Sequence, residues 1–191
     1  MTISKRDQIL NTALKLFIDH GIHETTTASI AKASKVATGT LFHHFGNKEE
    51  LVHALYHMIY DSLLNYKSKK TDHATACSVY DQLKRNWRFD IEWGTAHVEY
   101  FRFLERYSFQ HYASESAINE IYGRFEHHFD LFRKAVAAHE MRTDDLEYIR
   151  EHFIWNIRMN IAFFIDAPHQ CTPVDIERSF DIYWRGISQS S

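Results

Sequence analysis

The sequence has little of what usually interrupts helices or cross-links a small fold. It contains two prolines and six glycines in 191 residues, which favours long helices because both residue types break helices at internal positions. The two cysteines, Cys77 and Cys171, lie far apart and belong to no CxxC pair. This spacing is typical neither of a disulfide framework nor of a zinc knuckle, so we expect reduced thiols in a cytoplasmic protein.

Segments that mark membrane proteins and motifs that mark common enzymes are also missing. No apolar run reaches 18 residues, and the chain does not begin with a charged-then-apolar leader and cleavage site. We therefore expect neither a membrane span nor export. The sequence contains no glycine-rich phosphate loop, no G-x-S-x-G elbow and no HExxH helix. It predicts a cytoplasmic protein that is not an enzyme and uses no cofactor.

Histidine, by contrast, is abundant, with 14 residues in the chain. His53 and His57 are spaced one helical turn apart, and His127 and His128 are adjacent. A pair one turn apart can bind zinc or titrate near neutral pH. No clustered carboxylate or cysteine lies nearby in the sequence, so we predict no metal site. A metal- or pH-responsive role is kept as an alternative.

Charge is distributed unevenly along the chain. The formal net charge is −3, from 22 basic and 25 acidic residues. Between Met1 and Lys48, however, six basic residues face only three acidic ones, and the remainder is net acidic. A basic end on an acidic body predicts that a DNA duplex binds at the N-terminal end and is repelled by the rest.

Apolar residues recur at helical spacing through most of the chain, and no segment has the pattern of a strand. We therefore expect an all-α protein of about nine helices. The expected breaks include Trp93-Gly94 and the polar stretch 67–73, which is the best candidate for a domain boundary. The expected helices are 4–20, 27–34, 38–45, 48–66, 74–91, 95–112, 115–139, 144–165 and 174–189.

The segment from Thr25 to Glu50 is typical of two short helices joined by a tight turn. Thr26 is placed to cap the first helix, because its hydroxyl oxygen can accept from a first-turn backbone N–H. The turn is expected at Lys35-Val36-Ala37, and the second helix has one polar and one apolar face. This is the organisation of a helix-turn-helix, whose second helix enters the major groove of DNA. The core residues expected here are Ile30, Val36, Leu41 and Phe45.

The same segment resembles the TetR-type bacterial transcriptional regulators. The matching residues are Gly21, Thr26-Thr27, Ile30-Ala31, Val36, the run GTLFHHF from Gly39 to Phe45, and KEEL from Lys48 to Leu51. The resemblance implies a helix-turn-helix DNA-binding domain of three helices at 1–47. It also implies a helical effector-binding and dimerisation domain at 48–191, with helix 48–66 as the connector.

As a function, the resemblance implies a homodimeric repressor that binds a palindromic operator in double-stranded DNA and is released by a small-molecule effector. The alternative is an architectural or cell-division factor of the same fold that responds to no metabolite. Carried over by position, the residues implied to contact DNA are Thr27, Lys35, Thr38, Gly39, Thr40, Phe42, His43, His44 and Lys48.

Three positions depart from the family pattern. Ala28 stands where many relatives have a long basic or polar side chain, and Phe42 stands where a tyrosine is common. Ser29 replaces the acidic residue that usually completes a capping box with Thr26. These differences bear on which DNA sequence is read rather than on whether DNA is bound.

The resemblance also places an effector among the middle helices, where abundant aromatic residues imply an apolar or planar ligand. For each aromatic residue, plain core packing is the alternative, and Asn156 and Asn160 are equally suited to bonding across a helix interface. The candidate ligand-binding residues are Trp87, Trp93, Tyr100, Phe129, Trp155, Asn156, Met159, Asn160 and Phe163.

The last two helices are implied to form a four-helix bundle with a second copy of the chain, as a palindromic operator requires. The alternative is that they only close the core of their own subunit. The candidate dimer-interface residues are Phe153, Ile157, Ile161, Phe164, Phe180, Tyr183, Trp184 and Ile187.

Overall fold

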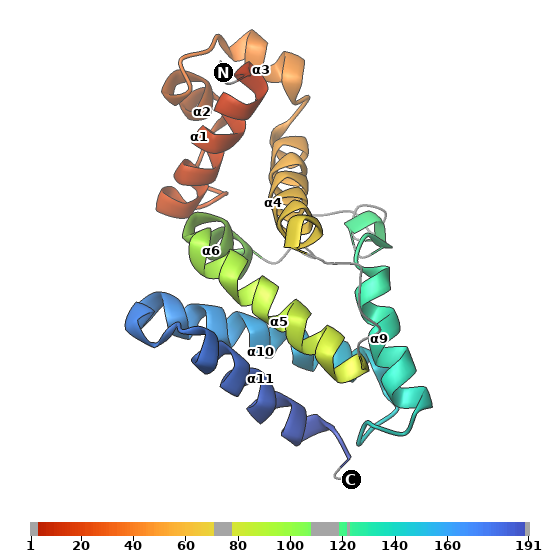
Figure 1. Cartoon of the computed structure of the whole chain (residues 1–191). Helices are drawn as coiled ribbons and strands as arrows, with labels where there is room; N and C mark the ends of the chain where they lie inside the picture. The colour runs from red at the N-terminus through yellow and green to blue at the C-terminus, as the bar shows by residue number, and fades with distance from the viewer. Residues whose placement is uncertain (1–3, 71–77, 108–118, 122, 190–191) are drawn as a thin grey trace. The chain divides into compact units, whose positions relative to one another are not determined.

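The computed structural model describes residues 4–70, 78–107, 119–121 and 123–189, without the side chains of His127 and His128. Cys77 therefore lies outside the described residues. Within these ranges every regular element is a helix, apart from one isolated antiparallel bridge between Met141 and Ser188. The all-α prediction is confirmed. The elements are α1 (Lys5–His20), α2 (Thr27–Ala33), α3 (Thr38–His44), α4 (Lys48–Lys70), α5 (Val79–Ala96), α6 (Val98–Arg106), α9 (Glu126–Ala137), α10 (Leu146–Asp166), the short 3-10 helix η1 (Pro168–Gln170) and α11 (Pro173–Ile187) (Figure 1).

None of the helices in the described part of the chain combines the length and the apolar character needed to cross a membrane.

The described residues form two compact units. The first comprises those within 1–62 and 98–121, and the second those within 63–97 and 122–191. Helix α4 contributes to both, with the change at Ser62–Leu63. We call these unit 1 and unit 2. The division into 1–47 and 48–191 stays a prediction.

Unit 1 is built around α1, which packs against α2, α3 and α6. Apolar residues at helical spacing bury one face of each helix. The expected core residues Ile30, Leu41 and Phe45 are at most 2% exposed, whereas Val36 is only half-buried. Their buried neighbours include Ile9, Leu10, Phe17, Leu51, Leu55, Tyr56 and Phe103.

Unit 2 is built around α5, which contacts α9, α10 and α11 (Figure 1). Its centre is Trp87, which is fully buried and donates from Nε1 to Ser179 Oγ at 2.9 Å. The ring centroids of Tyr183, Phe153 and Phe180 lie 4.9, 5.5 and 5.7 Å from that of Trp87. Aromatic groups of α10 and α11 thus fill the core of their own subunit.

Several expected helix bounds were wrong, among them the ends expected for the helices 48–66 and 74–91. The polar stretch 67–73 does not begin a linker, because α4 continues to Lys70. The side chain of Lys67 is buried and its Nζ lies 2.7 Å from Asp90 Oδ1 of α5. Helix α5 likewise continues through the expected break at Trp93-Gly94 and ends at Ala96.

Gly94 serves close helix packing rather than a helix end. A Cβ at this position would lie 2.6 Å from Ile161 Cδ1 and 2.9 Å from its Cγ2. Ile161 is itself 4% exposed, so it has little room to move. The missing side chain is what allows α5 and α10 to approach each other here.

We therefore expect Gly94→Ala to lower the free energy of unfolding by about 1–3 kcal/mol, as overpacking of a core does. Urea unfolding followed by circular dichroism measures the change. The matched control is Gly39→Ala in α3, where a Cβ would meet nothing within 4 Å. Ile161→Val, which removes the closest atom, should reduce the cost of Gly94→Ala in a double-mutant cycle; equal costs in both backgrounds would contradict this account.

Candidate nucleic-acid interface

The candidate interface consists of α2, α3 and the turn between them. Thr26 caps α2, as predicted: its Oγ1 accepts from the backbone N–H of Ser29 at 3.0 Å. Ser29 cannot complete a capping box, and its hydroxyl instead donates to the Thr26 carbonyl oxygen at 2.7 Å. The start of α2 is therefore held by short hydroxyl side chains.

The turn after α2 is set by backbone hydrogen bonds. Val36 N–H donates to Ala31 O at 3.0 Å and Lys35 N–H to Lys32 O at 3.2 Å, which is the bond pair of a Schellman motif. Lys35 occupies the left-handed position with a φ of 55°, although glycine is the usual residue there. The turn thus holds an exposed lysine in a defined conformation between the two helices.

Helix α3 is anchored from one face and accessible on the other. Leu41 is fully buried and Phe45, directly after the helix, is 2% exposed. The opposite face carries Thr38, Gly39, Phe42, His43 and His44, which are all exposed, and Phe42 keeps 45% of its surface accessible. A large apolar side chain that stays in water on a short helix is typical of a contact surface.

Neither backbone conformation nor packing inside the subunit requires a glycine at position 39. Gly39 does not have a positive φ. Among the glycines that the structure describes, Gly21 has one. A Cβ on Gly39 would meet nothing within 4 Å. Its missing side chain leaves the α3 backbone open to an approaching molecule.

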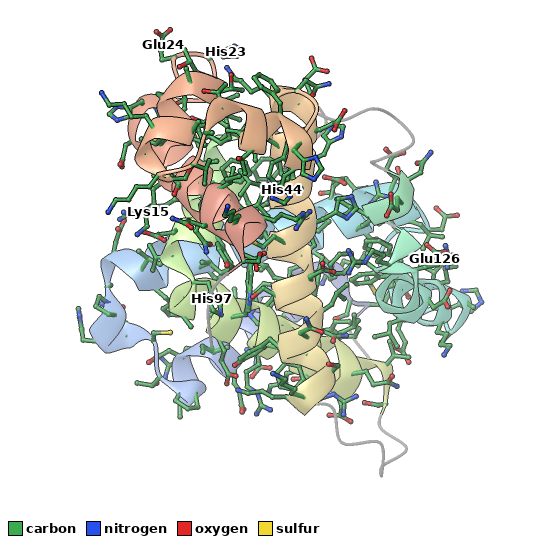
Figure 2. All side chains as sticks on the ribbon, turned by 90° about the horizontal axis from the view of Figure 1, so that it is seen from above. Lys15, His23, Glu24, His44, His97 and Glu126 are labelled. Carbon is green, nitrogen blue, oxygen red and sulfur yellow. The ribbon has the colours of Figure 1, made fainter. Side chains whose placement is uncertain are left out.

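The other predicted DNA-contact residues border this surface. Lys35 is exposed, whereas Thr27, Thr40 and Lys48 are partly buried. Lys48 Nζ donates to the carbonyl oxygen of His23 at 3.3 Å, so it ties the start of α4 to the loop between α1 and α2. In that loop, His23 and Glu24 are exposed and extend away from unit 1 (Figure 2). The roles of these residues toward DNA stay predictions.

The sequence reasoning missed several supporting residues. Asn47 caps α4, accepting from the N–H of Glu50 at 2.8 Å, while Glu50 Oε2 accepts from Gly46 N–H at 3.0 Å. The local signal was available, since a capping residue three positions before glutamate marks a helix start. Arg106 and Tyr107 bond to the end of α1. No local pattern marks that pair, because the partners are 88 and 90 positions away.

The predicted ligand-binding residues are not gathered around one described cavity. Trp87 and Trp93 are core residues of unit 2, whereas Tyr100 belongs to unit 1. Asn156 and Asn160 each donate to a carbonyl of their own helix, one turn earlier. Trp155, Met159 and Phe163 are 61%, 60% and 51% exposed on α10.

Only Phe129 of that set lines a described cavity, which lies between α9 and α10 and measures about 300 Å³. The Arg150 guanidinium lies 5.6 Å from the centre of the Phe129 ring. Arg133 forms ion pairs with Glu126 and Asp130. The remaining lining residues are Phe132, Leu146 and Glu147.

The predicted dimer-interface residues are mostly buried within the single chain, and their role in a dimer stays a prediction. Seven of them, Phe153, Ile157, Ile161, Phe164, Phe180, Tyr183 and Ile187, are at most 8% exposed within the single chain, and Trp184 is half-buried. Their stripe on α10 and α11 faces the core of unit 2. Among the large apolar residues left exposed on these helices are Tyr148, Trp155, Met159 and Phe163 of α10 with Ile182 of α11. We call this set the exposed apolar face.

Within the described ranges, no group of three or more His, Cys, Asp or Glu side chains is placed to hold a metal ion. Cys171 is a half-buried free thiol, and burial raises its pKa.

Comparison with known proteins agrees with this geometry. Residues 9–55 match the family described as bacterial regulatory proteins, tetR family. The transcriptional repressor KstR2 of Mycolicibacterium smegmatis is 34% identical over 73 residues, which are 38% of this chain and 36% of that protein. The transcriptional regulator UidR of Escherichia coli K12 is 40% identical over 50 residues, 26% of either chain. The matches thus span about a third and a quarter of the length of these relatives.

Solved structures extend the likeness to the whole chain. A putative tetR family transcription regulator from Shewanella sp. PV-4 has a TM-score of 0.85 at 26% identity, covering 98% of this chain and 100% of that one. The ketosteroid transcriptional regulator KstR2 of Mycobacterium tuberculosis has a TM-score of 0.68 at 20% identity, covering 100% and 98%, and shares the fold. Residues 9–55 of this chain thus match the tetR family of bacterial regulatory proteins, and the whole chain shares the fold of solved TetR-family regulators.

Proposed function

We propose that this protein is a cytoplasmic, homodimeric repressor that binds a palindromic operator and is released from it by a small, largely apolar or aromatic ligand. The observation that carries DNA binding is the two-faced α3. Leu41 and Phe45 anchor it in unit 1, while Thr38, Gly39, Phe42, His43 and His44 remain accessible.

The accessible side chains suit the major groove. Threonine and histidine donate and accept hydrogen bonds at base edges or phosphates, and Phe42 offers an apolar contact for a thymine methyl group. Lys35 in the turn supplies positive charge beside them, and Thr27 provides a hydroxyl near the start of α2. The absence of a side chain at Gly39 permits close approach of the α3 backbone.

The exposed apolar face supports a dimer. Trp155, Met159 and Phe163 are spaced four residues apart on α10, and Ile182 on α11 is 68% exposed. Soluble proteins rarely leave such a set of large apolar side chains in water unless a partner covers it. A second copy of the same face gives a two-fold interface, which matches the symmetry of a palindromic operator.

Support for the ligand class comes from the aromatic character of unit 2, where tryptophan, phenylalanine and tyrosine rings dominate the core around Trp87. A ligand bound to this unit alters DNA binding only if it binds the two forms of the protein with different affinity, which typically contributes about 1–3 kcal/mol of coupling.

Gly39→Ala tests the DNA-binding surface. A duplex is first selected from a random library by the wild-type chain, and its affinity is measured by fluorescence anisotropy. We expect roughly tenfold weaker binding, because the new methyl group stands between α3 and the DNA bases. Stability should stay equal or rise by up to about 1 kcal/mol, since alanine is the better helix former.

The stability measurement is the internal control, because it separates an obstructed surface from a damaged fold. Unchanged affinity in Gly39→Ala would show that α3 does not approach DNA as proposed. Failure of the wild-type chain to enrich any sequence would contradict the proposed function as a whole.

A further inference from the structure

The end of α6 is bonded to the end of α1 by two consecutive residues. Arg106 Nη1 donates to the carbonyl oxygen of Ile18 at 2.6 Å, and Tyr107 Oη donates to that of Phe17 at 2.7 Å. Carbonyl groups in the last turn of a helix carry its negative partial charge. A cationic guanidinium and a phenol hydroxyl are therefore suitable donors at this position.

Tyr107 also connects this point to α4. Its own carbonyl oxygen accepts from Tyr56 Oη at 2.6 Å. Tyr107 is 6% exposed and Tyr56 is fully buried, so both bonds are shielded from water. One buried tyrosine thus links α1, α4 and the end of α6 inside unit 1.

A series of hydrogen bonds leads from this point to the start of α2. The Phe17 carbonyl, which accepts from Tyr107, also accepts from Gly21 N–H at 2.9 Å. Gly21 has a φ of 92°, a conformation that favours glycine. Its carbonyl accepts from the Thr25 hydroxyl at 2.7 Å and from Thr25 N–H at 3.2 Å. Thr25 is 3% exposed and directly precedes Thr26, the cap of α2.

We infer that Arg106 and Tyr107 are positioning residues for DNA recognition. They fix the last turn of α1, and through Gly21 and Thr25 they fix where the helix-turn-helix begins. Tyr107 is too deeply buried to touch DNA itself, so it acts through α1. This inference rests on the proposed function, and it assigns a role in DNA recognition to two residues far outside the helix-turn-helix in sequence.

Tyr107→Phe tests the inference, because it removes the hydroxyl and keeps the ring. We expect roughly three- to tenfold weaker binding of the duplex selected by the wild-type chain, the effect of one lost hydrogen bond. We also expect amide hydrogen exchange at Gly21 and Thr25 to become roughly tenfold faster, while exchange in α5 and α10 is unchanged. Arg106→Met should act in the same direction, and Arg106→Lys should retain more affinity.

The matched control is Tyr80→Phe in unit 2, which removes a hydroxyl that donates to Asp181 Oδ1 at 2.6 Å. It deletes the same atom from the same residue type, yet it should change neither the DNA affinity nor the exchange at Gly21 and Thr25. A merely structural role for Tyr107 would give the two variants the same DNA affinity.

Two results would overturn the inference: wild-type affinity in Tyr107→Phe, or unchanged exchange at Gly21 and Thr25. If the wild-type chain selects no duplex, the proposed function fails on its own account. The exchange data then decide by themselves whether Tyr107 holds the end of α1 and the residues leading to α2.

Discussion

Trp155→Asp is expected to give a folded monomer that binds the selected duplex about a hundredfold more weakly than the wild-type chain. Trp155 is 61% exposed at the middle of the exposed apolar face, so the substitution removes little from the core of unit 2. In the proposed dimer it buries a carboxylate against a second apolar face, which is costly without a compensating partner. The affinity for the duplex falls because the helix-turn-helix segments of two copies are no longer joined and cannot bind the two half-sites of the operator together.

Sedimentation equilibrium measures the change in mass, and fluorescence anisotropy measures binding to the duplex. Trp155→Phe is the matched control, since it keeps an apolar ring and should remain dimeric with nearly wild-type affinity. Circular dichroism should show equal helix content in all three proteins. A wild-type chain that sediments as a monomer, or an aspartate variant that stays dimeric, would contradict the assignment of this face.

Asp90→Leu is expected to lower the free energy of unfolding by about 3–5 kcal/mol, the usual cost of removing one member of a buried ion pair. The Lys67 ammonium lies 2.7 Å from Asp90 Oδ1, and both side chains are largely buried, at 7% and 14% exposure. The substitution removes the negative charge that compensates this ammonium. Urea unfolding measures the loss.

The double variant Lys67→Met/Asp90→Leu should recover most of that loss. Burial raises the pKa of the Asp90 carboxyl even though Lys67 acts in the opposite direction, so ionising Asp90 as the pH rises through this raised pKa costs stability. An apolar pair of similar volume avoids this cost. Recovery in the double variant would mean that the ion pair contributes little to the free energy of unfolding. Its main role would then be to fix the position at which α4 packs against α5.

The partly exposed pair of Lys70 and Glu92 on the same two helices provides the control. Its side chains are 44% and 28% exposed, and pairs in contact with water contribute at most about 1 kcal/mol. Glu92→Gln should therefore lower stability far less than Asp90→Leu. Equal losses would show that burial is not what makes the Lys67–Asp90 pair costly to break.

The helix-turn-helix was predictable from sequence because its signals are local. Thr26 lies three positions before the N–H that it caps, and Leu41 lies on a seven-residue helix that Phe45 directly follows. Their hydrophobic spacing decides which face is buried. The exposure of Gly39 and His43 on the opposite face follows from the same spacing.

The periodicity of α10 does not decide its orientation, because this helix has two apolar stripes. One contains Phe153, Ile157 and Ile161, and the other contains Trp155, Met159 and Phe163. Hydrophobic spacing alone cannot say which stripe faces α5. The structure places the first stripe inside unit 2 and leaves the second stripe exposed.

By itself, the sequence determined an all-helical chain, the helix-turn-helix near its start and the face of α3 that stays accessible. These depend on residues within a few turns of one another. Only the tertiary structure decided three contacts. Gly94 packs closely against Ile161, Lys67 forms an ion pair with Asp90, and the Tyr107 hydroxyl donates a hydrogen bond to a carbonyl in the last turn of α1. Each of these contacts joins residues that are distant along the chain, and no short-range periodicity encodes such a pairing.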